Sequence, residues 1–311
     1  MLSKRVVVGT AFWSSCISLW MIVPSVLVFM PFLYPVVPFF MVFAMWGSRI
    51  IATTLRNMVS PTVLLRLLNQ YHQHDLGYTV IETSQLNLNE DQGYLFPSHP
   101  HGVFTIGTIM FYCWLWMKGG RISAIVAPTM LWLPILNIVL ILSNAYSAKK
   151  NTFLNRIRKI QDGCSLVWLP GGFEDVINME EPEDTISIPK GWVKYALQVG
   201  CRVVPVYHLG EHATFNLLRL PFSSLRRYYS KKFQTPLTFP WFRGKHGLPI
   251  PSMNPPIVTL TGAPIHFPRI KNPSTDQIDI WHTTYCTAVV SMVDGYSASV
   301  GHGKTSVKIV W

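Results

Sequence analysis

The sequence predicts an α/β protein in which a mostly parallel central sheet is flanked by helices and preceded by an N-terminal hydrophobic hairpin. Two observations lead to this prediction. From about residue 78, short apolar runs alternate with amphipathic segments, which is the pattern of strands and helices in a parallel sheet. Before that point the chain carries a long uncharged run suited to a bilayer. We therefore expect a membrane anchor followed by an α/β domain.

The uncharged run extends from Val6 to Ser48, 43 residues without Asp, Glu, Lys, Arg or His. A bilayer core needs about 20 apolar residues, so the run could cross twice or enter and return. Four prolines inside it would break a continuous helix and favour a hairpin. A signal peptide is the rival interpretation, but its apolar core spans only about 7–15 residues. We expect residues 1–48 to form the anchor and residues 49–311 the globular domain with interfacial segments.

Local patterns predict each element of that domain. Apolar runs between turn residues predict six strands: Tyr78–Glu82, Gly93–Phe96, Ile122–Val126, Ser165–Leu169, Arg202–Tyr207 and Ile257–Thr261. Amphipathic spacing predicts helices near residues 104–117, 150–162 and 190–199. A last helix begins at the capping box Ser274-x-x-Gln277 and carries an apolar stripe made of Ile278, Trp281, Tyr285, Ala288 and Met292.

Three further segments have the composition of membrane-surface elements. Residues 50–70 have helical spacing with arginines on the polar side. A second uncharged run, Ile122–Ala148, predicts a buried strand followed by a membrane-dipping helix. Residues 216–233 place leucines and a phenylalanine ahead of four cationic residues, which indicates an interfacial segment, with a solvated basic loop as the alternative.

Composition limits the class of protein. Hydrophobic residues make up 49% and charged residues 13%, whereas charged residues run at about a quarter in ordinary soluble proteins. The formal net charge of +11 suits an anionic membrane surface or a polyphosphorylated ligand. No nucleic-acid motif accompanies the charge, so we expect no nucleic-acid partner. Basic residues flank both ends of the anchor, which places both ends in the cytosol. The five scattered cysteines do not indicate a disulfide framework.

The segment His99-Pro100-His101-Gly102 is the strongest candidate for chemistry. Two imidazoles follow a predicted strand and are held by a proline and a glycine. Neutral histidine is suited to accept a proton near pH 7. Two other interpretations stay open from the residues alone: histidines that merely shape a turn, and half of a metal site. A metal site needs further ligands at suitable spacing, and no Cys-x-x-Cys occurs.

Two further motifs accompany the histidines. The run Leu166–Glu174 predicts a strand that ends in Pro-Gly-Gly, where backbone N–H groups can approach an oxyanion or a phosphate. An ordinary strand-ending turn is the alternative. A second unit runs from Pro189 through a short helix to a strand that ends at His208 and Glu211. Its Lys190 and Lys194 share one helix face, which suits phosphates or headgroups.

Taken in order, these motifs resemble a known family. The anchor, FPSHPHG, LPGGFE, PKGWVKYALQVGCRVVPVYHLGE, TGAPIHFP and IDIWHTTYCTAVVSM are similar to the diacylglycerol acyltransferase type 2 family, which includes monoacylglycerol and wax-ester acyltransferases. The resemblance runs from about residue 1 to 294, and ordered motifs are more specific than any single one. It implies an acyltransferase of the endoplasmic reticulum membrane, with its catalytic domain facing the cytosol and the lipid-droplet surface as a second location.

The resemblance also implies a reaction and partners. An acyl group passes from acyl-CoA to a lipid alcohol, first of all from acyl-CoA to diacylglycerol to give triacylglycerol. Acyl-CoA is a co-substrate, and direct transfer needs neither a cofactor nor a metal. Membrane lipids are expected partners, and homo-oligomerisation is left open. The alternatives are a wax-ester or sterol-ester synthase, a non-catalytic membrane lipid-binding protein, and a metal enzyme built on the two histidines.

The resemblance assigns roles by position. His101 would accept the proton of the attacking hydroxyl, Glu174 would orient its ring and stabilise the imidazolium, and His99 would shape the turn or the oxyanion site. The late His-x-x-Tyr motif falls on His282 and Tyr285. The substrate-binding or oxyanion-binding group comprises Pro100, Gly102, Gly171, Gly172, Lys190, Gly191, Glu211 and His282.

Three departures from the family pattern concern the choice of acceptor more than the reaction. Phe173-Glu174-Asp175 replaces smaller residues, His212 stands where many members carry Asn, and the segment after Gly295 matches no family motif.

Overall fold

The structure is a computed structural model that describes residues 3–11, 46–55, 61–88, 90–132, 136–178, 184–215, 222–233, 251–302, 305 and 307–310. Most of the predicted anchor, residues 12–45, lies outside the described residues. Within them, no helix is both long enough and apolar enough to cross a membrane. The division at residue 48 and the hairpin therefore stay predictions.

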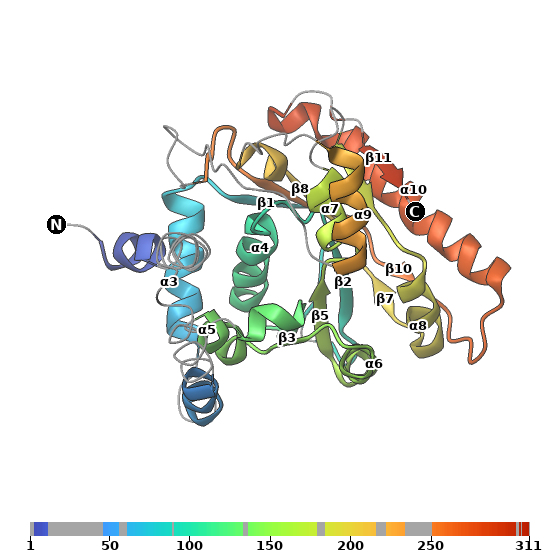
Figure 1. Ribbon diagram of the computed structural model, residues 1–311, viewed down its shortest axis with the longest axis horizontal. Coiled ribbons are helices and arrows are strands. Elements are labelled where there is room, and N and C mark those ends of the chain that lie inside the picture. Colours follow the sequence, from blue (N-terminus) through green and yellow to red (C-terminus); the bar gives the residue numbers. More distant parts are fainter. Residues whose placement is uncertain are drawn as a thin grey trace.

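A nine-stranded, mostly parallel sheet forms the centre of the described fold (Figure 1). Its main path is β1-β9-β8-β2-β5-β3-β4, and the two short strands β7 and β10 are attached beside β2. Every pairing is parallel except β8 with β9 and β7 with β10. A separate parallel pair joins β6 to β11. The strands are β1 (Thr79–Glu82), β2 (Tyr94–His99), β3 (Arg121–Val126), β4 (Ala145–Ser147), β5 (Cys164–Trp168), β6 (Asp184–Ser187), β7 (Arg202–Val203), β8 (Val206–Leu209), β9 (Val258–Thr261), β10 (Ile265–His266) and β11 (Val307–Val310).

Helices cover both faces of the sheet, as the prediction of an α/β fold requires (Figure 1). On one face, α4 packs against Tyr94 and Phe96 of β2. On the other, α6, α8 and α10 pack against Leu95 of the same strand. The alternation follows from the period of two in a strand. The α-helices are α3 (Thr62–His74), α4 (Ile106–Met117), α5 (Leu136–Leu142), α6 (Lys150–Arg158), α7 (Phe173–Asn178), α8 (Gly191–Val199), α9 (Ser223–Phe233) and α10 (Thr275–Tyr296), and residues 4–11 and 46–55 are also helical.

The predicted elements are confirmed with two informative differences. The strand predicted to end at Phe96 continues to His99, because pairing with β5 and β8 on both sides outweighs the donor that Pro97 lacks. The strand predicted over residues 202–207 divides into β7 and β8 around Pro205, which cannot donate to the ladder. The capping box is confirmed: Ser274 Oγ accepts from the Gln277 N–H, and the Gln277 side chain accepts from the Ser274 N–H.

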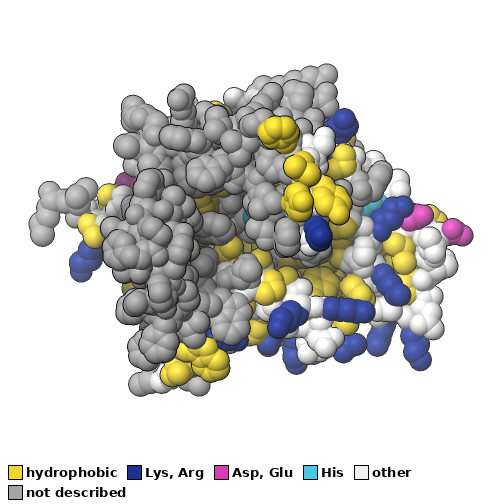
Figure 2. All heavy atoms as spheres, in the orientation of Figure 1, with side chains coloured by type: hydrophobic (Ala, Val, Ile, Leu, Met, Phe, Trp, Pro, Cys, Tyr) yellow, Lys and Arg dark blue, Asp and Glu magenta, His cyan; other side chains and the backbone are white. Residues whose placement is uncertain are grey.

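The predicted membrane-surface segments are partly described. Residues 122–148 contain β3, α5 and β4, so the predicted buried strand and the helix after it are both present. Residues 222–233 form α9 and the residue before it, and their exposed apolar side chains include Phe222, Leu225 and Tyr228. Figure 2 shows apolar side chains gathered on the surface in the region where Figure 1 places α9, beside a cationic side chain. Membrane contact at either segment stays a prediction.

Candidate active site

The candidate active site lies at one edge of the sheet, where three neighbouring parallel strands end. β2 ends at His99, β5 ends just ahead of Gly171 and Gly172, and β8 ends just ahead of Glu211. Because β5 and β8 both pair in parallel with β2, their carboxyl ends meet at this edge. The fold thus brings together three motifs that lie far apart in the sequence, at the edge where open parallel sheets bind ligands.

His101 has a ring nitrogen that is available as a base. Its Nδ1 lies 2.7 Å from the carbonyl oxygen of Gly102. A carbonyl can only accept, so Nδ1 carries the proton and donates it. Nε2 of the neutral ring then holds the lone pair. Burial lowers the pKa of His101 below its usual value despite the opposing effect of the bond to Gly102, so the ring is mainly neutral near pH 7.

The carboxylate that holds the His101 backbone is Asp175, which the sequence analysis did not select. Asp175 is fully buried, and its Oδ2 accepts the His101 N–H at 3.1 Å. Its Oδ1 accepts the N–H of Ser187, the last residue of β6, at 2.6 Å. Burial raises the pKa of Asp175 to about 7, although the two N–H donors oppose the rise.

Glu174, the acid that the sequence selected, makes a different contact. Its Oε2 accepts a hydrogen bond from Ser187 Oγ at 2.9 Å, and the Nδ1 of His101 is already taken by Gly102. The predicted contact between Glu174 and the His101 ring is therefore not the one that the structure shows. Successive residues of a helix point about 100° apart, so only one of two adjacent acids in α7 can face the histidine loop. Sequence alone had no signal to choose between them.

Gly171 and Gly172 have different surroundings and therefore different roles. At Gly171, a Cβ would overlap the carboxylate of Asp175, so this glycine makes room for the buried acid. Gly172 has a φ of +49°, and among the described residues no atom lies within 4 Å of where its Cβ would be. Only Gly172 therefore keeps the open surroundings that the predicted oxyanion role needs.

Glu211 fastens the other end of the histidine loop. Its side chain is fully buried, and its two oxygens accept the N–H groups of Ile106 at 3.0 Å and Gly107 at 2.6 Å. These are the first N–H groups of α4, where a carboxylate also complements the helix dipole. Burial raises the pKa of Glu211 to about 7. Gly102 has a φ of +60°, and a Cβ there would overlap the Glu211 carboxylate. Glu211 thus positions the loop at the start of α4.

His99 is fully buried and is held by α10. The O–H of Tyr285 donates to the Pro97 carbonyl at 3.2 Å, so His99 Nε2–H donates to the Tyr285 oxygen at 3.1 Å. Burial lowers the pKa of His99 to about 3, which keeps the ring neutral. Its Nδ1 is buried without a hydrogen-bond partner among the described residues. Pro100, also buried, links this fixed ring to the half-buried ring of His101.

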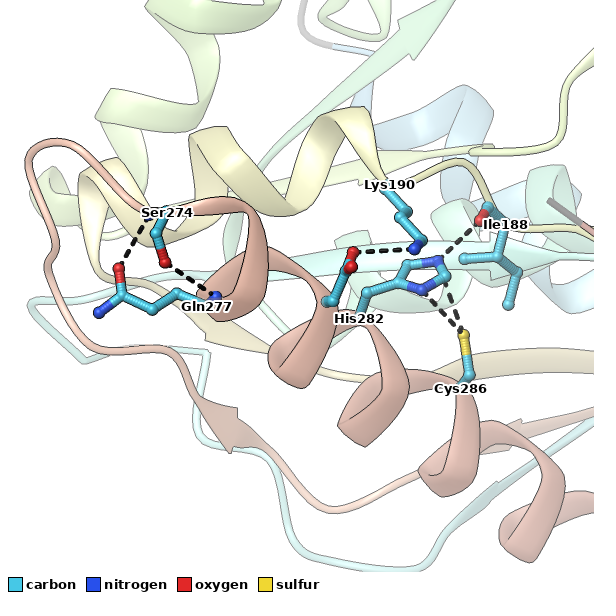
Figure 3. A network of polar contacts seen from close by, with 7 residues as sticks. Ile188, Lys190, Ser274, Gln277, His282 and Cys286 are labelled. Carbon is cyan, nitrogen blue, oxygen red and sulfur yellow. Dashed lines mark hydrogen bonds and ion pairs between the residues drawn. The ribbon is translucent and has the colours of Figure 1, made fainter.

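The remaining predicted residues lie around α8 and α10 (Figure 3). His282 Nε2–H donates to the Ile188 carbonyl at 2.8 Å, and its ring lies next to the Cys286 thiol. Lys190 forms an exposed ion pair with Asp279 at 2.8 Å. Among the described residues, nothing lies within 4 Å of a Cβ at Gly191, so no packing demand explains that glycine. His282 therefore joins α10 to the residue that follows β6.

His208 was noted in the sequence, but its role is structural. Its ring nitrogens contact Thr108 Oγ1 at 3.1 Å and Thr259 Oγ1 at 2.8 Å. Thr259 in turn contacts the hydroxyl of Tyr78 at 2.8 Å. A Cβ at Gly107 would lie 2.6 Å from the His208 ring. The ring therefore locks the start of α4 against β8 and β9.

No group of three or more His, Cys, Asp or Glu side chains in the described part of the chain is arranged to hold a metal ion. The two imidazoles of the His-x-His motif make different contacts: His99 contacts Tyr285, and His101 contacts Gly102.

Curated relatives are similar over most of the chain. Diacylglycerol O-acyltransferase 2 of Xenopus tropicalis is 27% identical over 250 residues, which cover 72% of this chain and 66% of the relative. Human diacylglycerol O-acyltransferase 2-like protein 6 is 27% identical over 240 residues, 70% of each chain. Human diacylglycerol O-acyltransferase 2 is 25% identical over 236 residues, 71% of this chain and 61% of the relative. The chain thus spans roughly two thirds of the length of these relatives.

Among solved structures, the 1-acyl-sn-glycerophosphate acyltransferase PlsC of Thermotoga maritima aligns with 86% of this chain and 94% of its own, with a TM-score of 0.43 and 12% identity. That likeness is too distant to bear on the function of this chain.

The fold and site define an α/β protein whose histidine loop is held at the carboxyl edge of a parallel sheet by two buried carboxylates. The model of the diacylglycerol acyltransferase family matches residues 26–310. The chain belongs to this family.

Proposed function

We propose that this protein is an acyl-CoA-dependent O-acyltransferase that esterifies an acylglycerol, with diacylglycerol as the acceptor and triacylglycerol as the product. Membership of the diacylglycerol acyltransferase family supports the reaction class. One structural observation carries the mechanism: His101 donates Nδ1–H to its neighbour's carbonyl, and Nε2 is left as the free base at the edge of the sheet.

The acceptor hydroxyl attacks the thioester carbonyl of acyl-CoA, and Nε2 of His101 takes the hydroxyl proton as the new C–O bond forms. The tetrahedral intermediate then expels the CoA thiolate by breaking the C–S bond, and the imidazolium returns the proton to that sulfur. The ester and free CoA are the products, so His101 ends as it began. The lowered pKa of His101 supports this role, because a base must be neutral before the reaction.

The backbone around the loop supports transition-state stabilisation. Gly172 lies in open surroundings at the carboxyl end of β5, and its N–H and that of Gly102 are our candidates for the oxyanion site. Asp175 and Glu211 hold the loop from its two ends, so His101 does not need to be ordered when the substrate arrives.

A membrane location follows from the substrates. Both the acyl donor and the acceptor carry long apolar chains, and the uncharged run before residue 49 is suited to a bilayer. Figure 2 shows Lys and Arg side chains gathered over the lower right of the molecule, where Figure 1 places α6 and α8. Exposed cations there include Lys150, Arg158 and Lys194. Such a surface suits the phosphates of CoA or the anionic cytosolic leaflet of the endoplasmic reticulum.

The test is ester synthesis in membranes that contain the protein, with labelled acyl-CoA and a panel of diacylglycerol, monoacylglycerol, fatty alcohol and sterol. We expect labelled triacylglycerol. His101→Ala should lower the rate by about 10²–10⁴-fold, the usual contribution of a general base. His266→Ala is the matched control, because His266 is exposed and lies outside the site. Full activity of His101→Ala would refute the base assignment.

Other products separate the alternatives. Esters of the fatty alcohol or the sterol alone would indicate a wax-ester or sterol-ester synthase. Loss of activity on chelation would favour a metal enzyme. Lipid binding without any ester would indicate a non-catalytic lipid-binding protein.

A further inference from the structure

The segment after α10 was expected from the sequence to depart from the family pattern, but the family model extends over it to residue 310. It contacts the supports of both buried carboxylates. It consists of a turn at Ser297–His302, Thr305 and strand β11. Ser297 is fully buried, and its oxygens accept the N–H groups of His302 at 3.3 Å and Thr305 at 3.3 Å. We call these described residues the brace.

The first contact of the brace is with β6. All four residues of β11 pair in parallel with β6, from Val307 opposite Asp184 to Val310 opposite Ser187. Beyond the strand, the Ile188 N–H donates to the Val310 carbonyl at 3.1 Å. In the described part of the chain β6 pairs with no other strand, so β11 alone provides its backbone hydrogen-bond partners. Ile186 and Ile188 are fully buried, and Val307 and Ile309 pack against the same core.

Ser187, which β11 holds in place, meets both acids of α7. Its N–H donates to Asp175, whose other oxygen accepts the His101 N–H. Its hydroxyl donates to Glu174. A buried carboxylate that loses one of two N–H donors is poorly satisfied and reorients. The position of β6 therefore reaches the backbone of His101 through one side chain.

The second contact of the brace is with the turn that carries the other acid. Gly210 precedes Glu211 and has a φ of +86°. A Cβ on Gly210 would lie only 2.8 Å from Cε1 of His302. The Nε2–H of His302 donates to the carbonyl of Pro256, which lies on the same side of Gly210. His302 thus closes the space behind the turn from which Glu211 reaches α4.

We propose that the brace is a positioning element of the active site, which holds Ser187 and the Gly210 turn so that Asp175 and Glu211 keep the histidine loop in its reactive geometry. This inference rests on the proposed function for its kinetic consequence, but its structural part does not depend on the reaction.

The test compares the full chain with a variant that lacks residues 307–311. We expect kcat to fall by about tenfold to hundredfold, because a buried acid loses support, while the KM for acyl-CoA changes by less than about twofold. A synthetic peptide of residues 304–311 should restore activity, and the same peptide with Val310→Pro should not. Lys308→Ala in the full chain is the control, since this side chain is exposed and the strand pairing remains.

Amide hydrogen exchange provides a readout that does not need activity. Without β11, the amides of Ser187 and His101 should exchange at least about tenfold faster, with the rest of the sheet unchanged. If the shortened chain does not fold, the variant His302→Ala tests the second contact of the brace. We then expect faster exchange of the Ile106 and Gly107 amides, which are the groups that Glu211 binds. Unchanged kcat and unchanged exchange would overturn the proposal. If the parent protein makes no ester with any acceptor, the proposed function fails, and the exchange data alone decide the role of the brace.

Discussion

Gly102→Ala should be far more destabilising than Gly172→Ala, although both glycines have positive φ. Gly102 has a φ of +60° and Gly172 of +49°, so an alanine is strained to a similar degree at each, by about 1–2 kcal/mol. The difference between the sites is their surroundings. A Cβ at residue 102 would overlap the Glu211 carboxylate, whereas at residue 172 no described atom lies within 4 Å.

The extra cost at Gly102 follows from what Glu211 does. A displaced carboxylate loses its two bonds to the N–H groups of Ile106 and Gly107 in a fully buried setting. At about 1.5 kcal/mol for each charge-assisted bond, the loss is about 3 kcal/mol beyond the backbone strain. We therefore expect the free energy of unfolding to fall by about 4 kcal/mol for Gly102→Ala and by about 1 kcal/mol for Gly172→Ala.

The assay is equilibrium unfolding by urea in detergent, followed by tryptophan fluorescence, on the parent protein and both variants. Gly102→Ala should also lower ester synthesis, because the histidine loop moves with the displaced acid. If the two variants were equally stable, the reasoning that Gly102 is required by Glu211 would be refuted.

Three further outcomes are expected. Asp175→Asn should lower the rate of ester synthesis by about tenfold to hundredfold more than Glu174→Gln. The NH₂ of the new asparagine would face one of the two backbone N–H donors whose hydrogen bonds Asp175 accepts. Equal effects of the two variants would contradict the assignment of Asp175 as the acid that holds His101. Tyr285→Phe should lower the free energy of unfolding by about 1–3 kcal/mol, because it leaves the buried His99 donor unpaired; urea midpoints measure this, and no change would argue against the contact. His208 has a folded pKa of about 3, below its unfolded value, so it contributes stability above about pH 6.5 that is lost as the pH falls toward 3. His208→Gln, which can keep both hydrogen bonds but takes no proton, should flatten that acid loss of stability, and an unaltered pH profile would count against a buried neutral ring.

The sequence by itself determined the fold class, the six strand segments and the main helices that it predicted, the helix cap at Ser274 and the motif proposed to carry the base; strands β6, β10 and β11 had no such signal. The predicted features depend on local periodicity and on short-range hydrogen bonds. The extension of β2 to His99 could not be predicted from the sequence. Pro97 favours an end to the strand, but pairing with β5 and β8 on its two sides continues it.

Only the tertiary structure decided which acid serves the histidine loop and which ring nitrogen is free. Glu174 and Asp175 are adjacent in the sequence, and the direction in which α7 presents them selects Asp175 for His101. The two histidines are separated by a single proline, yet Tyr285 holds one from a distant helix while a neighbouring carbonyl orients the other. The choice of acid and the contact that holds His99 depend on groups far apart in the chain, and the turn that brings the Gly102 carbonyl to His101 is fixed by its contacts with Glu211.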